Sequence, residues 1–142
     1  MRIAILYYSG TGNTEQMAQY IAQGVREAGY SADVIPISQC QKDLLIQYDK
    51  IMFGCPASAE EELEEIEFLP YYEEIEADLG ETEIALFGSY GWGDGQWMRD
   101  WEKRVKSRGL RLYKEGLIIL DDPTSYQQEC RDFGYQFVTS EE

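Results

Sequence analysis

The stretch that decides the fold reads IAILYYSGTGNT and runs from Ile3 to Thr14. Its first half is an apolar run, as in a strand that is covered on both faces of a sheet. Its second half is a short loop rich in glycines and hydroxyls, and an amphipathic helix pattern begins where the loop ends. Glycines let a backbone approach an anion, and the N–H groups of a first helical turn point at it. The stretch therefore predicts a strand, a phosphate-binding loop and a helix.

Every side-chain donor in this loop is neutral. The candidate phosphate ligands are Ser9, Gly10, Thr11, Gly12, Asn13 and Thr14. The loop has neither the lysine of the nucleotide-binding pattern G-x-x-x-x-G-K-S/T nor the spacing G-x-G-x-x-G. Neutral donors suit a phosphate monoester. The alternative is an ordinary turn in which Asn13 or Thr14 caps the helix.

Apolar and amphipathic segments alternate along the rest of the chain. Strands are expected at residues 2–7, 32–36, 48–54, 84–88 and 117–120. This alternation predicts an α/β fold, in which a five-stranded parallel sheet forms the middle of a three-layer, doubly wound sandwich. No linker or repeat divides the chain, so we expect one domain over residues 1–142.

Four helices are expected from the spacing of apolar residues and from glycine stops. The first covers residues 14–28 and stops at Gly29, and the second carries Tyr71, Tyr72, Ile75 and Leu79 and stops at Gly80. The third carries Trp97, Trp101 and Val105 and stops at Gly109, and the last opens at Asp122-Pro123-Thr124 and turns Tyr126, Cys130, Phe133 and Phe137 inward. The helical spacing of Trp97 and Trp101 places both in the core.

The histidine and cysteine content of the chain excludes several classes of catalytic and metal site. The chain has no histidine, which removes the commonest general base near neutral pH and excludes hydrolysis of the Ser-His or Cys-His kind. Its three cysteines lack CxxC spacing, which argues against a disulfide framework and against a zinc or other metal site, and fits a reducing compartment. No long apolar stretch or signal peptide is present, so we expect a cytoplasmic protein that does not enter membranes.

The formal net charge of −15 speaks against nucleic acids and anionic membranes as partners and favours basic protein surfaces. The alternative is that the acidity serves solubility alone. Ligands of doubly wound sheets bind outside the carboxyl ends of the strands. That rule selects the loops at residues 8–14, 55–62 and 89–95.

The third loop carries an aromatic candidate. It reads Ser89-Tyr90-Gly91-Trp92-Gly93-Asp94-Gly95. A tryptophan between glycines at a strand end is poorly placed for the core and well placed to lie over a planar aromatic ligand. The alternative is that Trp92 packs over its own loop. A phosphate loop, an aromatic platform and no histidine together describe a phosphorylated aromatic cofactor that carries the chemistry itself.

These motifs resemble those of the short-chain bacterial flavodoxins, especially the clostridial type, over essentially the whole chain. The strongest pieces are SGTGNTE at residues 9–15, FGSYGWGDG at residues 87–95 and LEExEF at residues 63–68. The resemblance implies the strand order 2-1-3-4-5 and one non-covalently bound FMN. It also implies an electron carrier rather than an enzyme, which shuttles single electrons at low potential between basic redox proteins. We expect a monomer.

The resemblance also assigns roles to residues. Loop 9–14 would hold the FMN phosphate, Trp92 would stack on the outer flavin face, and the N–H groups of Gly91 and Gly93 would reach the pyrimidine oxygens. Glu61 would accept from flavin N3–H, and Asp121 would approach the ribityl chain. The remaining cofactor-binding candidates are Pro56, Ala57, Ser58, Ala59, Glu60, Ser89, Tyr90 and Asp94. Carboxylates at residues 60–65 and at Asp94 would disfavour an anionic reduced flavin.

The second loop departs from the family. It reads Cys55-Pro56-Ala57-Ser58-Ala59-Glu60-Glu61, where the clostridial pattern is Cys-Ser-Ala-Met-Gly-Asp-Glu. Pro56 lacks a phosphate-binding hydroxyl, and Ser58 replaces an apolar side chain at the inner flavin face. Ala59 replaces a glycine whose peptide turns to accept from reduced flavin N5–H. The resemblance thus implies FMN binding with altered affinity and redox tuning.

Two other functions stay open at this point. One is a flavodoxin-fold, FMN-dependent reductase of NAD(P)H or a quinone, which an NAD(P)H oxidation assay without added reductase would detect. The other is a non-redox binding module that kept the fold and lost the flavin, which an absorbance spectrum of the purified protein would reveal.

Overall fold

The structure is a computed structural model that describes residues 1–58 and 61–140. Two of the predicted cofactor-binding residues, Ala59 and Glu60, lie outside the described residues. The peptide turn expected at Ala59 lies outside them as well.

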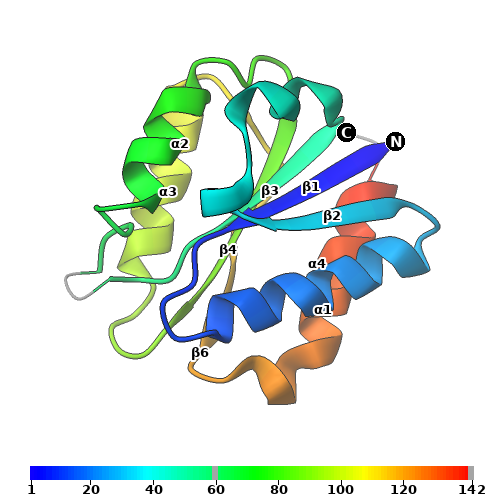
Figure 1. Cartoon of the computed structure of the whole chain (residues 1–142). Helices are drawn as coiled ribbons and strands as arrows, with labels where there is room; N and C mark the ends of the chain where they lie inside the picture. The colour runs from blue at the N-terminus through cyan, green and yellow to red at the C-terminus, as the bar shows by residue number, and fades with distance from the viewer. Residues whose placement is uncertain (59–60, 141–142) are drawn as a thin grey trace.

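A parallel sheet forms the middle of the molecule (Figure 1). Its strands are β1 (Arg2–Tyr7), β2 (Ser31–Pro36), β3 (Lys50–Gly54), β4 (Glu83–Tyr90), β5 (Arg111–Leu112) and β6 (Leu117–Leu120). The spatial order is β2-β1-β3-β4-β5, and β6 pairs with residues 87–90 of β4. This order confirms the 2-1-3-4-5 topology, with the fifth strand divided into β5 and β6.

Helices cover both faces of the sheet (Figure 1). α1 (Asn13–Glu27) and α4 (Gln127–Thr139) pack together on one face. α2 (Phe68–Glu76) and α3 (Gln96–Ser107) cover the other face. Side chains along β1 alternate between the two layers: Ile3 and Ile5 pack under α1, and Ala4 and Leu6 pack under α2 and α3. No helix within residues 1–58 and 61–140 combines the length and the hydropathy that crossing a bilayer would require.

Two details of the expected helices were wrong. Tyr126 was expected to face inward, but it is 40% exposed. It ends a separate 3₁₀ helix (Pro123–Tyr126), so it is out of phase with the buried stripe of α4. α2 ends at Glu76, and Leu79 is buried from the turn after it rather than from the helix. Between β2 and β3 the chain forms two 3₁₀ helices, Ile37–Gln39 and Lys42–Gln47.

A close contact beneath the carboxyl edge positions the loops above it. A Cβ built at Gly88 on β4 would lie 2.2 Å from the Cys55 carbonyl oxygen, so only glycine fits there. The same carbonyl oxygen accepts a hydrogen bond from Trp97 Nε1 of α3 at 3.1 Å. Trp97 and Trp101 are each 1% exposed, which confirms that both belong to the core. The end of β3, the middle of β4 and α3 are therefore locked together.

Candidate functional site

Loops from four strands meet at the carboxyl edge of the sheet. Backbone hydrogen bonds join them: Tyr8 N–H donates to the Gly54 oxygen (2.9 Å), Ala57 N–H to the Ser89 oxygen (3.0 Å) and Asp121 N–H to the Tyr90 oxygen (2.8 Å). Between the loops lies a pocket of about 320 Å³. It is lined by Tyr8, Gly10, Thr11, Asn13, Pro56, Ala57, Ser58, Glu64, Ser89, Tyr90, Gly91 and Asp121.

The first loop is shaped by Ser9. Its hydroxyl oxygen accepts from Gly12 N–H (3.0 Å) and from Glu15 N–H (3.2 Å), and Gly12 takes a left-handed conformation with φ +100° before α1. Within the described residues, the backbone N–H groups of Thr11, Asn13 and Thr14 have no protein acceptor. A Cβ built at Gly12 would meet no atom within 4 Å. The loop thus presents unused N–H donors to open space at a helix N-terminus, as an anion site requires.

Thr14 is buried beneath the first loop and does not itself line the pocket. It is 1% exposed, and its Oγ1 is 2.8 Å from Ser89 Oγ and accepts from Ser89 N–H at 3.3 Å. One hydroxyl of the pair donates to the other, which leaves one hydroxyl hydrogen for a ligand. This pair ties α1 to β4 across the sheet edge, and Ser89 brings it to the pocket wall.

The third loop contains two glycines with positive φ angles, Gly93 and Gly95, and an exposed tryptophan. Trp92 is 58% exposed and is absent from the pocket lining, so its ring is available to cover a ligand from outside. A Cβ at Gly93, where φ is +85°, would lie 2.4 Å from the Glu61 carboxyl group. Glu61, itself at φ 54°, accepts from the N–H of Gln96 at the start of α3 (3.2 Å). The second and third loops are therefore interlocked.

Two further acidic candidates, Asp94 and Asp121, differ in their surroundings. Asp94 forms an ion pair with Arg99 (3.0 Å), so its charge is partly compensated rather than left free on the rim. Asp121 has a left-handed backbone with φ 59° and lines the pocket, with its Oδ1 3.5 Å from where a Cβ at Gly91 would be. Backbone conformations of this kind cost a non-glycine residue free energy and often occur at binding sites.

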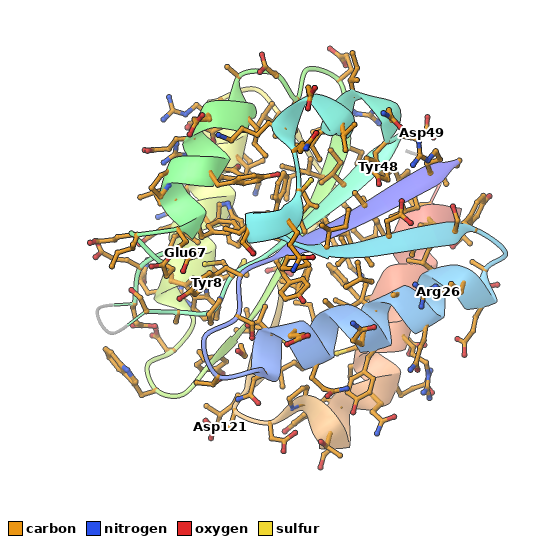
Figure 2. All side chains as sticks on the ribbon, in the orientation of Figure 1. Tyr8, Arg26, Tyr48, Asp49, Glu67 and Asp121 are labelled. Carbon is orange, nitrogen blue, oxygen red and sulfur yellow. The ribbon has the colours of Figure 1, made fainter. Side chains whose placement is uncertain are left out.

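Two residues of the pocket wall, Tyr8 and Glu64, were not among the predicted cofactor-binding residues, although both lie in segments that the sequence places near the ligand. Burial raises the pKa of Tyr8, and the carboxylates of Glu64 and Glu67 and the Cys55 thiol raise it further. Figure 2 shows Tyr8 beside Glu67. The position of Tyr8 directly after a strand could have revealed it, because the carboxyl end of β1 had been selected as a ligand edge. No sequence signal separates Glu64 from its acidic neighbours.

Comparisons with known proteins agree with this geometry. The family model described as Flavodoxin matches residues 5–134. The flavodoxin of Clostridium beijerinckii is 45% identical over 92% of this chain and 94% of its own. The flavodoxin of Megasphaera elsdenii is 36% identical over 93% of this chain and 95% of its own. The solution structure of the two-electron reduced Megasphaera elsdenii flavodoxin superimposes with a TM-score of 0.87 over 97% of this chain and 99% of its own, at 34% identity.

The chain belongs to the flavodoxin family. Flavodoxins are FMN-based electron carriers and not enzymes, so the reductase alternative is not favoured. The pocket of this flavodoxin fits FMN by the chemistry of its donors. Hydroxyl, amide and N–H donors line the pocket at Thr11 and Asn13, beside the start of α1, and donors of this kind suit a phosphate dianion.

Proposed function

We propose that this flavodoxin acts as a low-potential one-electron carrier, with FMN held in the pocket between its first, second and third loops. Bound FMN supplies the reversible electron transfer, and the protein binds it, orients it and limits its charge. One observation carries the proposal. Backbone N–H groups without a protein acceptor, at the start of α1, lie at the edge of a pocket of about 320 Å³ at the carboxyl ends of the strands.

The proposed roles follow the pocket from one end to the other. Ser9, Gly10, Thr11, Gly12, Asn13 and Thr14 hold the phosphate, with help from Ser89. Asp121 lies along the ribityl chain, and Tyr90, Gly91, Trp92 and Gly93 enclose the flavin with Pro56, Ala57 and Ser58. Glu61 accepts from the flavin imide. The carboxylates on this side of the pocket lower the potential because they disfavour further negative charge.

We further propose that the chain acts as one domain over residues 1–142, as a monomer in the cytoplasm, and exchanges electrons with basic redox proteins. The net charge of −15 supports basic partners. Exposed carboxylates at Glu62, Glu65 and Glu67 add local negative charge to residues 61–67, a segment that reaches the pocket wall through Glu64.

Replacing Trp92 by alanine is expected to weaken FMN binding by about 1–2 kcal/mol, the scale of a stacking contact with its buried area. It is also expected to restore flavin fluorescence, because the stacked indole quenches emission. Fluorescence titration with FMN measures both effects. Trp92→Phe is the matched control, since it keeps an aromatic face and most of the affinity. Unchanged affinity and unchanged quenching in Trp92→Ala would remove Trp92 from the proposed site.

Electron transfer with a basic flavodoxin reductase is expected to slow as salt is added. Attraction between opposite charges raises the association rate, and it is screened beyond about 8 Å at physiological ionic strength. Stopped-flow rates at low and high ionic strength measure the effect. A rate that does not change with salt would contradict the proposed basic partner.

A further inference from the structure

A groove of about 470 Å³ lies at the amino ends of the strands, at the edge of the sheet opposite the flavin pocket. One wall is the 3₁₀ helix Lys42–Gln47, and the other is the end of α2 with the turn that leads into β4. Ile51, the second residue of β3, also lines the groove and is buried. Figure 1 shows the 3₁₀ helix that precedes β3 at this end of the sheet, away from the start of α1. We call this feature the amino-edge groove.

The 3₁₀ helix in the wall of the amino-edge groove exposes apolar side chains. Leu44, Leu45 and Ile46 follow one another in it, and Leu44 is 43% and Ile46 90% exposed, whereas Leu45 is buried. Runs of exposed apolar residues are unfavourable on a protein surface unless they have a function. The apolar surface continues into the groove, which Leu45, Ile75 and Leu79 line. The groove and this helix therefore offer a partner a connected apolar area.

The polar residues of the amino-edge groove give it a negative charge. Lys42 pairs with Glu74, and its Nζ lies 5.6 Å from the centroid of the Tyr71 ring, so its charge is compensated. Asp43 and Asp78 come from opposite walls, and both are exposed. In the part of the chain that the structure describes, neither carboxylate forms an ion pair or accepts a hydrogen bond. An apolar interior is thus combined with two uncompensated carboxylates.

We propose that the amino-edge groove docks a segment of another protein in which apolar side chains are flanked by lysine or arginine. The apolar side chains of that segment fill the space between the walls, and its basic side chains pair with Asp43 and Asp78. A second copy of this chain is a poor occupant, because two copies that each carry a net charge of −15 repel each other. The same charge disfavours an anionic membrane surface.

Docking at this edge leaves the flavin pocket free. The groove and the pocket share no lining residue, so the inference does not depend on the proposed FMN site. A groove of this size buries less area than a stable interface, so the contact is transient. It holds the protein on its partner while the carboxyl edge of the sheet remains available for electron exchange.

Two labelled peptides of equal charge test the amino-edge groove. The first is Lys-Leu-Leu-Lys-Lys-Leu-Leu-Lys with blocked ends, and the second has serine in place of each leucine, so it measures attraction to acidic surfaces in general. The unchanged protein is expected to bind the leucine peptide about tenfold more tightly or more, with and without added FMN, because burial of one leucine side chain exceeds that factor. Fluorescence anisotropy of a red-emitting dye measures the binding. Equal binding of the two peptides would overturn the proposal.

Replacing Ile46 by serine tests where the leucine peptide binds. Ile46 is 90% exposed, so Ile46→Ser leaves the core intact. It is expected to weaken binding of the leucine peptide about tenfold. Ile66→Ser is the matched control, because Ile66 is 83% exposed and lies in the acidic segment that reaches the flavin pocket through Glu64. Full binding by Ile46→Ser, or an equal loss in Ile66→Ser, would contradict docking in the groove.

The double variant Asp43→Asn/Asp78→Asn tests the expected charge of the partner. It is expected to bind the leucine peptide about threefold more weakly or more, the scale of two exposed ion pairs. Glu27→Gln/Glu129→Gln removes the same charge from exposed positions on α1 and α4 and is expected to stay within about twofold of the unchanged protein. Equal affinities of the two double variants would rule out a basic partner.

Two further measurements separate the proposed partner from other occupants. The leucine peptide is expected to shift the amide resonances of residues 42–47 and 75–82, and shifts confined to residues 8–14 and 89–95 would overturn the proposal. Sedimentation of the unchanged protein is expected to show the same monomer as Ile46→Ser. A dimer that Ile46→Ser abolishes would assign the groove to a second copy of the chain and would also overturn the proposal.

Discussion

Replacing Gly88 by alanine is expected to destabilise the protein by about 2–3 kcal/mol, the upper part of the range for overpacked cores. The new methyl group would lie 2.2 Å from the Cys55 carbonyl oxygen and 3.1 Å from the Trp97 ring. Because the carbonyl is backbone, it cannot rotate away as a flexible side chain could. β4 would have to move away from the residue that follows β3, beneath the pocket.

The same substitution is expected to weaken FMN binding, because displacement of Cys55 moves the start of the second loop and strains the hydrogen bond from Trp97 Nε1. Urea unfolding of the FMN-free protein measures the stability, and FMN titration measures the binding. Gly91→Ala is the matched control from the same segment: its methyl group would meet only Asp121 Oδ1, at 3.5 Å. Equal unfolding midpoints for the two variants would show that β3 and β4 adapt to the extra methyl group.

Replacing Glu76 by alanine is expected to cost about 3 kcal/mol, the lower end of the range for removing one partner of a buried ion pair. Glu76 is 7% exposed and accepts two hydrogen bonds from Arg104, at 2.9 and 2.8 Å. Arg108 lies 3.5 Å from the same carboxylate. The Arg104 guanidinium is held over the Tyr72 ring, 5.5 Å from its centroid, so it would stay partly buried with only the more exposed Glu73, at 3.8 Å, as a counter-charge.

This cost is expected to disappear in acid. Burial alone would raise the pKa of Glu76, but the hydrogen bonds and charge of Arg104, the charge of Arg108 and the Tyr72 hydroxyl lower it overall. The ion pair therefore stabilises the fold above the ordinary glutamate pKa of about 4.3, and its contribution is lost as pH falls through the lowered value. Urea unfolding of Glu76→Ala and the unchanged protein, from pH 7 downward, measures the difference.

Glu74→Ala is the control for an exposed pair. Glu74 pairs with Lys42 at the surface, where both side chains are well exposed, so its loss is expected to cost less than about 1 kcal/mol. If Glu74→Ala and Glu76→Ala destabilise equally, or if the cost of Glu76→Ala does not depend on pH, the pair of Glu76 and Arg104 does not stabilise the packing of α2 on α3 as a buried ion pair.

The parallel sheet and the ligand edge could be anticipated because they depend on local patterns, whereas the strand order was implied by the resemblance to the flavodoxins. Apolar runs at residues 3–7 and 84–88 mark strands buried on both faces, and parallel strands place their carboxyl ends together. The inward direction of Tyr126 was mispredicted because one unbroken helix was assumed. A 3₁₀ turn that Asp122 caps changes the phase of the side chains before α4 begins.

The sequence by itself determined the α/β class, the order of elements, the glycine- and hydroxyl-rich loop before the first helix and the family, because each depends on residue types and their spacing along the chain. Only the tertiary structure decided which members of the acidic run matter. Glu61 reaches the start of α3, Glu64 binds three N–H groups at the start of α2, and Asp94 pairs with Arg99. Charge and polarity are the same for all carboxylates in a sequence, but their partners come from segments that only folding brings within hydrogen-bond distance.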